Sequence, residues 1–282
     1  MGKFDGVLLA SDFDNTLIYT EEALRTSQPI PPLGEENRRA LEYFMAEGGK
    51  FALATGRALP SLKHLIPLVP FNAPCVVCNG AAIYDFEAEK YLEYAMLEQQ
   101  ALRRADVALQ QFPTVGVEAY HIQNTVHVVH PNAATRQHKH LTHVDMEECS
   151  SMLEVPLPLG KLLFEEEHDV LEQVLAFYRQ KGWAQDYEMI FSGKMLLEQT
   201  RKGATKGGMV LKLAQLLGVD RKDLYCVGDE ANDLSMLREA AQGFAPENAI
   251  PAVRECGATI VSHARKTALA DVIDILDEKY PG

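Results

Sequence analysis

The sequence of 282 residues lacks any apolar run near the roughly 20 residues that a helix needs to cross a bilayer. Its opening residues also lack the apolar segment of a secretory signal. Positive charge is scarce, because 27 Lys and Arg residues stand against 40 Asp and Glu residues, which gives a formal charge of −13. These absences argue against a membrane protein and against a binder of nucleic acid, whose phosphates attract basic surfaces. We therefore expect a cytoplasmic protein whose partners are small molecules, and the sequence carries no signal for an oligomeric state.

Cysteine is also sparse, and the five cysteines, an odd number, do not form the paired framework of a disulfide-rich domain. Cys75 and Cys78 make a single C-x-x-C pattern, which also occurs in redox and zinc sites. However, 74–79 is predicted as a buried strand, in which residues three apart face opposite sides and lie about 10 Å apart, too far for a disulfide. No second pair supplies the other two ligands of a zinc site. We therefore interpret both cysteines as structural.

The first part of the sequence alternates buried strands with amphipathic helices. Hydrophobic residues make up 47% of the chain, which is typical of a globular protein with one large domain or two moderate ones. Short apolar runs predict strands at 7–11, 51–54 and 75–78, and helical spacing predicts helices at 35–47 and 62–68. Strands that alternate with helices are typical of an α/β fold with a parallel sheet.

The middle of the sequence has a different character. Helical spacing predicts helices at 94–112 and 170–181, and an alternation of apolar and polar residues predicts a strand at 125–130. Short strands with one polar face are typical of an antiparallel sheet that carries helices on one side. We therefore predict an inserted α+β domain, a cap, at 84–195.

Alternating strands and helices return near the end of the sequence. Strands are predicted at 196–198 and 224–227, and a helix begins between them at 205–208. Short strands and a closing helix complete the pattern, at 243–246, 259–261 and 269–279. We therefore predict a Rossmann-like three-layer core with a parallel sheet, formed by 1–83 and 196–282.

Two carboxylates follow the first predicted strand, at Asp12 and Asp14. Because the ligands of parallel sheets bind at the carboxyl ends of the strands, these side chains are candidates for a functional site. Two acids this close repel each other, which raises a pKa or requires a cation. The alternative is that they cap a helix, since Asp and Thr favour that position.

Three further groups of polar residues occupy comparable places. Thr55, Gly56 and Arg57 follow the second strand, where a hydroxyl and backbone N–H groups can hold an anion, although an ordinary turn can have the same composition. Lys206 opens a helix, an unfavourable place for a cation unless an anion lies nearby. A second acidic group follows the strand at 224–227, in the sequence Gly228-Asp229-Glu230-Ala231-Asn232-Asp233.

The inserted region is rich in histidine. Its histidine spacings match no metal motif, and His127 and His130 would face opposite sides of a strand, so solvated side chains are favoured over a metal site. Lys161 is a candidate substrate contact, but a solvated lysine is the favoured interpretation. The histidines concerned include His121, His127, His130, His138, His140 and His143.

Together these groups closely resemble the four motifs of the haloacid dehalogenase superfamily of phosphotransferases. The motifs are D-x-D-x-T at 12–16, a Thr at Thr55, a Lys at Lys206 and G-D-x-x-N-D at 228–233. The wide gap between the second and third motifs is similar to the cap insertion of the Cof-type, or IIB, subgroup. The tripeptide Asn79-Gly80-Ala81 and the dipeptide Asn248-Ala249 fit that subgroup as well. The resemblance covers essentially the whole chain. It rests on motifs in the core, and on the length and the general sequence pattern in the cap.

The resemblance implies a phosphatase in which Asp12 attacks phosphorus and forms an aspartyl-phosphate. Asp14 would protonate the leaving oxygen and then accept a proton from the hydrolytic water. Thr55 and Lys206 would hold the phosphoryl oxygens. The other residues implied in phosphate or substrate binding are Gly56, Arg57, Asn79 and Asn232.

The resemblance also implies Mg²⁺ as the cofactor, because this ion prefers hard oxygen ligands. The ion would be held by Asp12, the Asp14 backbone carbonyl, Asp229 and Asp233, while Asn232 and Asp233 orient Lys206 or metal-bound water. Asn15 stands where many relatives have glycine, and asparagine tolerates the left-handed backbone that such a turn needs. Glu230 replaces a small residue and adds negative charge near the metal.

We therefore expect a Mg²⁺-dependent phosphatase whose cap closes over small phosphorylated metabolites, with sugar phosphates as the leading substrate class. A phosphomutase that uses the same aspartate and a catalytically silent, phosphate-binding regulator are the alternatives. The presence of all the motif carboxylates and of Lys206 argues against the silent regulator.

Asp12→Asn should abolish turnover of a generic aryl phosphate, because a carboxamide cannot serve as the attacking nucleophile. Circular dichroism of the variant should match that of the unchanged protein. A variant with near-normal turnover would contradict the role of Asp12.

Overall fold

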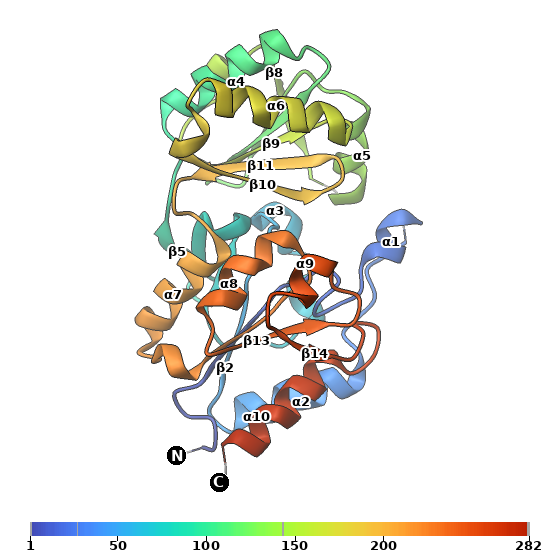
Figure 1. Ribbon diagram of the computed structural model, residues 1–282, viewed down its shortest axis with the longest axis vertical. Coiled ribbons are helices and arrows are strands. Elements are labelled where there is room, and N and C mark those ends of the chain that lie inside the picture. The colour runs from blue at the N-terminus through green and yellow to red at the C-terminus, as the bar shows by residue number, and fades with distance from the viewer. Residues whose placement is uncertain (1, 27, 143, 281–282) are drawn as a thin grey trace.

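The computed structural model describes residues 2–26, 28–142 and 144–280. The chain forms two parts, and the lower part in Figure 1 contains both chain ends while the upper part is built from the middle of the chain. The described helices include none that is both long and apolar enough to cross a membrane. The arrangement confirms the predicted α/β core with an inserted α+β cap.

The lower part, the core, is organised around a five-stranded parallel sheet with the order β14-β13-β12-β1-β2. Strand β1 lies inside the sheet, where its four residues are all buried. Its two neighbours therefore deliver their carboxyl ends to either side of the residue that follows β1. The strands are β1 (Leu8–Ser11), β2 (Lys50–Leu53), β12 (Leu224–Val227), β13 (Gln242–Pro246) and β14 (Thr259–Val261).

Helices cover both faces of the core sheet and complete three layers. Because successive side chains of a strand point to opposite faces, Leu9 packs in one apolar cluster while Leu8 and Ala10 pack in another. The first cluster contains residues of α2 (Glu35–Ala46) and α10 (Ala268–Lys279), and the second contains residues of three other helices. Those helices are α7 (Lys206–Leu217), α8 (Leu234–Glu239) and α9 (Pro251–Arg254). Two short helices complete the core, α1 (Glu21–Arg25) and α3 (Leu59–Leu62).

A three-stranded antiparallel sheet extends the core beyond β2. It consists of β3 (Cys75–Val77), β4 (Ala82–Asp85) and β5 (Lys90–Tyr94), and a bridge between Ala54 and Val76 connects it to the end of β2. Cys78, predicted in the same strand as Cys75, instead lies in the turn after it with a positive φ of 52°. All five cysteines have free thiols, as expected.

The cap contains a six-stranded sheet with the order β10-β11-β9-β6-β7-β8. Its pairs are antiparallel except for β7 and β8, which run parallel. The strands are β6 (Gly116–His121), β7 (Val126–Val129), β8 (Met146–Cys149), β9 (Leu159–Glu165), β10 (Tyr187–Gly193) and β11 (Leu196–Arg201). The helices are α4 (Gln99–Gln111), α5 (Ala133–Thr142) and α6 (His168–Gln180).

The two faces of the cap sheet are chemically different. Alternate residues of β6, β9 and β11 pack against α4 and α6 in an apolar cluster, among them Val117, Leu162 and Leu197. The residues between them form the opposite face, which is polar although it is buried. This polar face contains Glu118, Tyr120, Lys161, Glu165 and Glu198. The cap sheet therefore uses one face for stability and presents the other toward the core.

Strand pairing bears on the boundaries of the cap. Half of β4 and all of β5 lie at or beyond residue 84, yet both pair within the sheet that adjoins the core. Strand β11 begins at Leu196, where the core was expected to resume, yet it pairs with β9 and β10 of the cap. We therefore propose that the cap lies between Tyr94 and Arg201. Two predicted helices also differ in extent. Tyr94 belongs to β5, and in place of one helix at 62–68 the structure has α3, which ends at Leu62, and a separate 3-10 turn at Ile66–Leu68.

Gly207 tests the close packing that places the start of α7 against the first turn of α8. A Cβ added at Gly207 would lie 2.4 Å from the backbone carbonyl oxygen of Ser235. Gly207→Ala should therefore lower the free energy of unfolding by about 1 to 3 kcal/mol, the usual cost of overpacking, as measured by urea denaturation. Gly160→Ala is the control, because its Cβ would meet Ala81 at an ordinary 3.7 Å. Equal stability of the two variants would contradict this packing.

Candidate active site

The sequence motifs meet at the carboxyl ends of three neighbouring strands. Asp12 follows β1, Thr55 lies two residues beyond β2, and Asp229 lies two residues beyond β12. Because β2 and β12 flank β1 in the sheet, the order of the strands brings these residues together. Lys206 is the first residue of α7 and approaches the same place from the side of the sheet.

Lys206 is buried between two carboxylates. Its Nζ lies 2.9 Å from Oδ1 of Asp12 and 2.6 Å from Oδ1 of Asp233. Burial lowers the pKa of Lys206, but Asp12 and Asp233 outweigh it and raise that pKa above its ordinary value. A lysine at the N-terminus of a helix is unfavourable with respect to the helix dipole. The two anions beside the Lys206 ammonium group explain why it lies there.

Asp233 is held by the turn that follows β12. Its Oδ2 accepts hydrogen bonds from the backbone N–H groups of Asp229 and Glu230, each at 2.9 Å, while its Oδ1 accepts the bond from Lys206. The Glu230 side chain completes a capping box with Asp233. Glu230 is therefore the first residue of this turn and also adds a negative charge to it. Asp233 orients Lys206.

Three carboxylates lie together beside the single ammonium group. Ligand oxygens of Asp12, Asp229 and Asp233 all lie within 4.8 Å of one another. Burial, with a contribution from Asp233, raises the pKa of Asp12 to about 7, and the same two causes raise the pKa of Asp229 well above its ordinary value. This excess of buried negative charge fits a divalent cation with oxygen ligands. Thr16 donates a hydrogen bond of 2.5 Å to Oδ1 of Asp229 and orients it.

The side chain of Asp14 forms an ion pair with Arg57. The Nε and Nη2 atoms of Arg57 lie 2.7 and 2.8 Å from its two carboxylate oxygens, and Thr20 donates a further hydrogen bond of 2.7 Å. Burial raises the pKa of Asp14, but the Arg57 guanidinium and these hydrogen bonds outweigh it and lower the pKa. Asp12 and Asp14 therefore have opposite pKa shifts although they are two residues apart.

The turn that carries these two acids has the expected left-handed residue. Asn15 has a φ of 55°, and its backbone oxygen accepts a hydrogen bond of 2.7 Å from Asn248. The side-chain oxygen of Asn15 also accepts hydrogen bonds from the backbone N–H groups of Thr20 and Glu21. The asparagine thus occupies the conformation that favours glycine and also closes the loop.

Thr55, Asn79 and Asn232 form a second group beside the acids. The Thr55 hydroxyl accepts a hydrogen bond of 3.1 Å from the backbone N–H of Arg57, and Asn232 donates one of 2.8 Å to Asn79. Two buried atoms of this group, Nδ2 of Asn79 and Oδ1 of Asn232, have no hydrogen-bond partner among the described residues. A buried amide with unused donors and acceptors is suited to a polar ligand.

A cavity of about 520 Å³ opens between these motifs and the cap. Six of the ten predicted site residues line it, and the other four lie behind them. The lining residues are Asp12, Asp14, Gly56, Arg57, Asp229 and Asn232. The supporting residues are Thr55, Asn79, Lys206 and Asp233, which contact the first group through the bonds described above.

The polar face of the cap sheet forms the opposite wall of this cavity. Lys161, interpreted from the sequence as solvated, is buried, and its Nζ donates to the backbone oxygen of Gly56 at 3.1 Å and to Glu198 at 3.0 Å. The interpretation was wrong because the strand face that carries Lys161 is covered by the core. Other wall residues that sequence reasoning did not single out are Tyr120, Ser192, Lys194 and Glu198.

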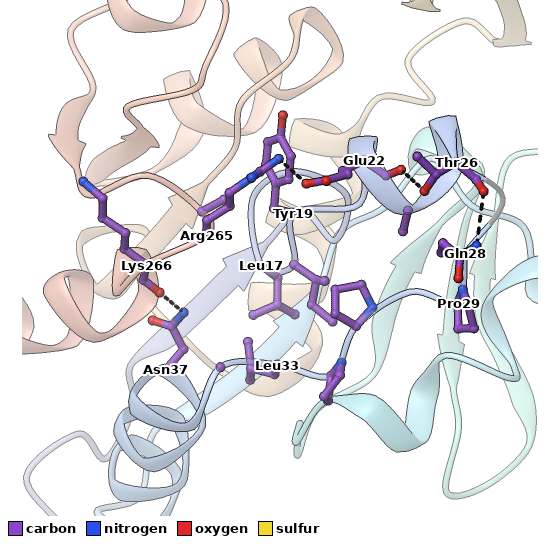
Figure 2. Close-up of a pocket in the computed structure, with 16 residues that line it drawn as sticks. Leu17, Tyr19, Glu22, Thr26, Gln28, Pro29, Leu33, Asn37, Arg265 and Lys266 are labelled. Atoms are coloured by element: carbon purple, nitrogen blue, oxygen red, sulfur yellow. Dashed lines mark hydrogen bonds and ion pairs between the residues drawn. The ribbon is translucent and has the colours of Figure 1, made fainter.

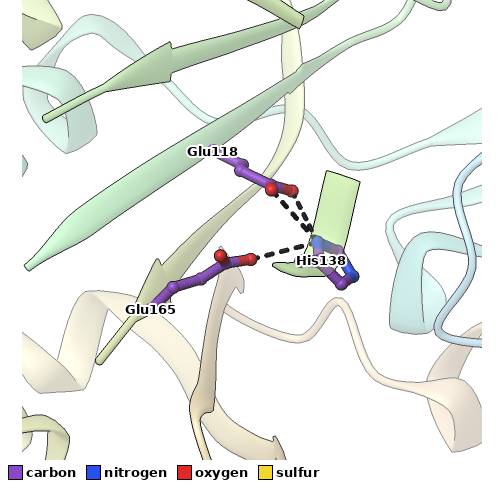
Figure 3. Close-up of side chains that lie close together, drawn as sticks. All are labelled: Glu118, His138 and Glu165. Carbon is purple, nitrogen blue, oxygen red and sulfur yellow. Dashed lines mark hydrogen bonds and ion pairs between the residues drawn. The ribbon is translucent and has the colours of Figure 1, made fainter. Parts of the chain in front are cut away.

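The cap histidines also differ from the expectation of solvated side chains. His130 is exposed, but His127 is buried, and His138 lies in the cavity wall with its side chain 19% exposed. His138 contacts Glu118 and Glu165 (Figure 3). Burial lowers the pKa of His138, but its contacts with these glutamates raise it to about 10. His143 lies outside the described residues.

A second hollow, of about 460 Å³, lies beside the core (Figure 2). Residues within 17–26, 28–34 and 264–266 form most of its wall, and an ion pair of 2.7 Å between Glu22 and Arg265 crosses one side. None of the ten predicted site residues lines this hollow. The candidate active site is therefore the cavity between the core and the cap.

Residues 9–273 match the model of the family described as haloacid dehalogenase-like hydrolases. The chain belongs to this family. Among curated proteins, it is 27% identical over 260 residues to YxeH of Bacillus subtilis (strain 168), which carries a provisional phosphatase name, with 88% of this chain and 90% of YxeH covered. It is 26% identical over 293 residues to YwtE of the same organism, which is named as 5-amino-6-(5-phospho-D-ribitylamino)uracil phosphatase. The match covers 95% of this chain and 97% of YwtE.

Solved structures of haloacid dehalogenase proteins share the fold of the whole chain. BT1666 from Bacteroides thetaiotaomicron has a TM-score of 0.80 at 19% identity, with 96% of this chain and 95% of that chain covered. BT4131, described as a subclass IIB sugar phosphatase, has a TM-score of 0.78 at 20% identity. The match covers 96% of this chain and 98% of BT4131. The predicted Cof-type fold and the expected enzyme class, a hydrolase of this superfamily, are confirmed.

Arg57→Gln tests the ion pair with Asp14. The folded-state pKa of Asp14 lies below its ordinary value of 3.8, so the pair stabilises the fold above pH 3.8 and this contribution is lost as the pH falls through the folded-state pKa. At pH 7 the variant should lose about 1 to 2 kcal/mol of unfolding free energy, measured by urea denaturation, and the loss should shrink as the pH is lowered past 3.8.

Arg39→Gln is the matched control, because the ion pair of Arg39 with Glu35 is exposed and should contribute little. A loss in Arg57→Gln that does not change with pH would contradict the assignment to the ionised carboxylate of Asp14.

Proposed function

We propose that this hydrolase is a Mg²⁺-dependent phosphatase that acts on small phosphorylated metabolites, sugar phosphates foremost, through an aspartyl-phosphate. One observation carries the proposal: Asp12 lines the cavity between the core and the cap and contacts Lys206, and Asp229 and Asp233 lie next to it. This arrangement supplies a nucleophile, a fixed positive charge and a place for a cation at one point.

Asp12 is the proposed nucleophile. The backbone N–H of Phe13 donates to its Oδ1 at 2.7 Å, and Lys206 contacts the same oxygen. Both interactions fix the carboxylate and leave Oδ2 as the oxygen that attacks phosphorus. Attack forms the bond between Oδ2 and phosphorus and expels the alcohol, and hydrolysis of the acyl phosphate then regenerates the carboxylate.

Asp14 is the proposed general acid and base. Its carboxylate, ionised beside Arg57, can accept a proton from the hydrolytic water in the second step. The first step needs a protonated Asp14, and movement of the carboxyl group from Arg57 toward the leaving oxygen would remove the interaction that lowers its pKa. We therefore assign Arg57 as a positioning residue for Asp14.

The phosphoryl oxygens would be held by Lys206, the Thr55 hydroxyl and the backbone N–H groups that follow Thr55, with Asn232 at the side. Mg²⁺ bound by Asp12, Asp229 and the Asp14 carbonyl would offset the repulsion between the carboxylates and a phosphate dianion. Asp233 would orient Lys206 and water beside the ion, since both of its oxygens already accept hydrogen bonds.

The cap wall supports a leaving group with several hydroxyls. Lys161, Tyr120 and Glu198 offer donors and acceptors, and Oγ of Ser192 is buried without a hydrogen-bond partner among the described residues. The relatives BT4131 and YwtE are named as phosphatases of a sugar and of a ribityl compound, which supports the same class of substrate here. A cap that covers the cavity would also exclude water from the first step.

With hexose phosphates as substrates, the protein should release free phosphate without accumulating an isomerised sugar phosphate. Phosphate release should stop in EDTA and return with added Mg²⁺, because the buried carboxylates cannot accept the substrate dianion without a cation. Phosphate release and sugar phosphate isomers are measured in the same samples.

Isomer formation without phosphate release would overturn the hydrolase proposal in favour of a mutase. Binding of the sugar phosphate without any turnover would favour the silent regulator. Activity that persists in EDTA would contradict the metal assignment.

A further inference from the structure

Three side chains from different elements of the cap converge on the polar face of its sheet (Figure 3). They are Glu118 of β6, Glu165 of β9 and His138 of α5. The Nδ1 atom of His138 lies 2.9 and 3.1 Å from the two carboxylate oxygens of Glu118 and 3.1 Å from Oε1 of Glu165. The proposed phosphatase chemistry makes no use of these contacts.

Hydrogen bonds do not satisfy all the polar atoms of Glu118, His138 and Glu165. Nδ1 of an imidazole carries at most one proton, yet three carboxylate oxygens surround it. The side chain of Glu165 is fully buried, and apart from the ion-pair contact of Oε1 with His138 its oxygens have no hydrogen-bond partner among the residues that the structure describes. Buried carboxylate oxygens without donors are rare in native proteins and call for a ligand or an ion.

The spacing of the ligand atoms, which is also that of N–H···O hydrogen bonds, is compatible with metal coordination. For metal–ligand distances of roughly 2.1 Å, adjacent ligands of an octahedral ion lie about 3 Å apart. The observed separations of 2.9 to 3.1 Å between Nδ1 and the carboxylate oxygens have this value. Each carboxylate thus offers an oxygen at this spacing from Nδ1, and the ligand atoms of all three residues lie within 4.8 Å of one another.

The charge of the group also fits a cation. Glu118 and Glu165 are both 0% exposed, and the single imidazole can neutralise at most one of them. An unpaired buried carboxylate costs several kcal/mol in effective desolvation. A divalent cation, with a neutral imidazole, would balance both carboxylates.

The surrounding structure holds the three side chains in place. Near the start of α5, Oδ1 of Asn132 accepts a hydrogen bond from the backbone N–H of Thr135. Its Nδ2 donates a hydrogen bond of 2.7 Å to the backbone oxygen of Glu165. Gly116, opposite Glu165 in the sheet, allows Thr135 to approach, because a Cβ there would lie 2.5 Å from the Thr135 methyl group. Tyr120 donates to Glu118 at 2.6 Å, as outer partners of metal-binding carboxylates do.

We propose that Glu118, His138 and Glu165 bind one divalent transition-metal ion, with Zn²⁺ as the representative ion. The imidazole nitrogen in the ligand set favours such an ion over Mg²⁺, which takes oxygen ligands. This site lies in the cap and is separate from the all-carboxylate group of the core. It would fix α5 to the sheet at the wall of the active-site cavity.

Zinc content and cobalt substitution test the site on the full chain. After equilibrium dialysis against Zn²⁺, elemental analysis should show one fewer ion per chain in Glu165→Gln and in His138→Gln than in the unchanged protein. Glu147→Gln and His168→Gln are the controls, since their side chains are 71% and 47% exposed and outside the group, and their zinc content should be unchanged.

Proton NMR of the cobalt-substituted protein distinguishes the cap site from the core. Co²⁺ at the cap should produce a hyperfine-shifted, exchangeable imidazole N–H signal, whereas the core carboxylates Asp12, Asp229 and Asp233 include no imidazole. The signal should be absent in His138→Gln and present in His168→Gln.

Equal zinc content of Glu165→Gln and the unchanged protein would overturn the proposal and leave a cluster that shares protons. If the variants fail to fold, the unchanged protein still decides, because the absence of a shifted imidazole signal would also overturn it. Neither readout depends on phosphatase activity, so failure here leaves the proposed function untouched.

Discussion

Lys206 brings the start of α7 to the carboxyl end of β1, with its ammonium group in contact with Asp12 and Asp233. Three segments that are far apart in the sequence therefore depend on one buried cation. Removal of one partner from a buried ion pair commonly costs about 3 to 5 kcal/mol, because the remaining charge stays unsolvated. The same contact that positions the proposed nucleophile thus also holds together the carboxyl end of β1, helix α7 and the turn after β12.

The core of the candidate site could be predicted from the sequence because its signals are local and its topology is simple. Asp12, Thr55 and Asp229 each follow an apolar run that is too short for a helix, and parallel strands bring such residues to one edge. Lys206 was visible because it opposes the helix dipole. The left-handed backbone of Asn15 was implied only by the resemblance, in which many relatives have glycine at this position.

The cap could not be predicted at the same level. Lys161 and His138 look like ordinary solvated residues in the sequence, since nothing nearby indicates that a second domain or a pair of glutamates covers them. Burial of these side chains results from contacts between distant segments, such as that of Lys161 with Gly56. Strand β11 was assigned to the core for the same reason, because sheet membership depends on pairing partners that a local pattern does not specify.

The alternation within the cap strands has a consequence for how such an enzyme can change over evolutionary time. In β9, Leu162 and Phe164 pack against helices, while Lys161, Leu163 and Glu165 belong to the other face. Substitutions at every second position can therefore alter what the cavity recognises without disturbing the packing beneath the helices. An insertion or deletion of a single residue would exchange the two faces and damage both at once. New substrate preferences are consequently accessible to this cap by point substitution, and strand length is the property that selection must keep constant.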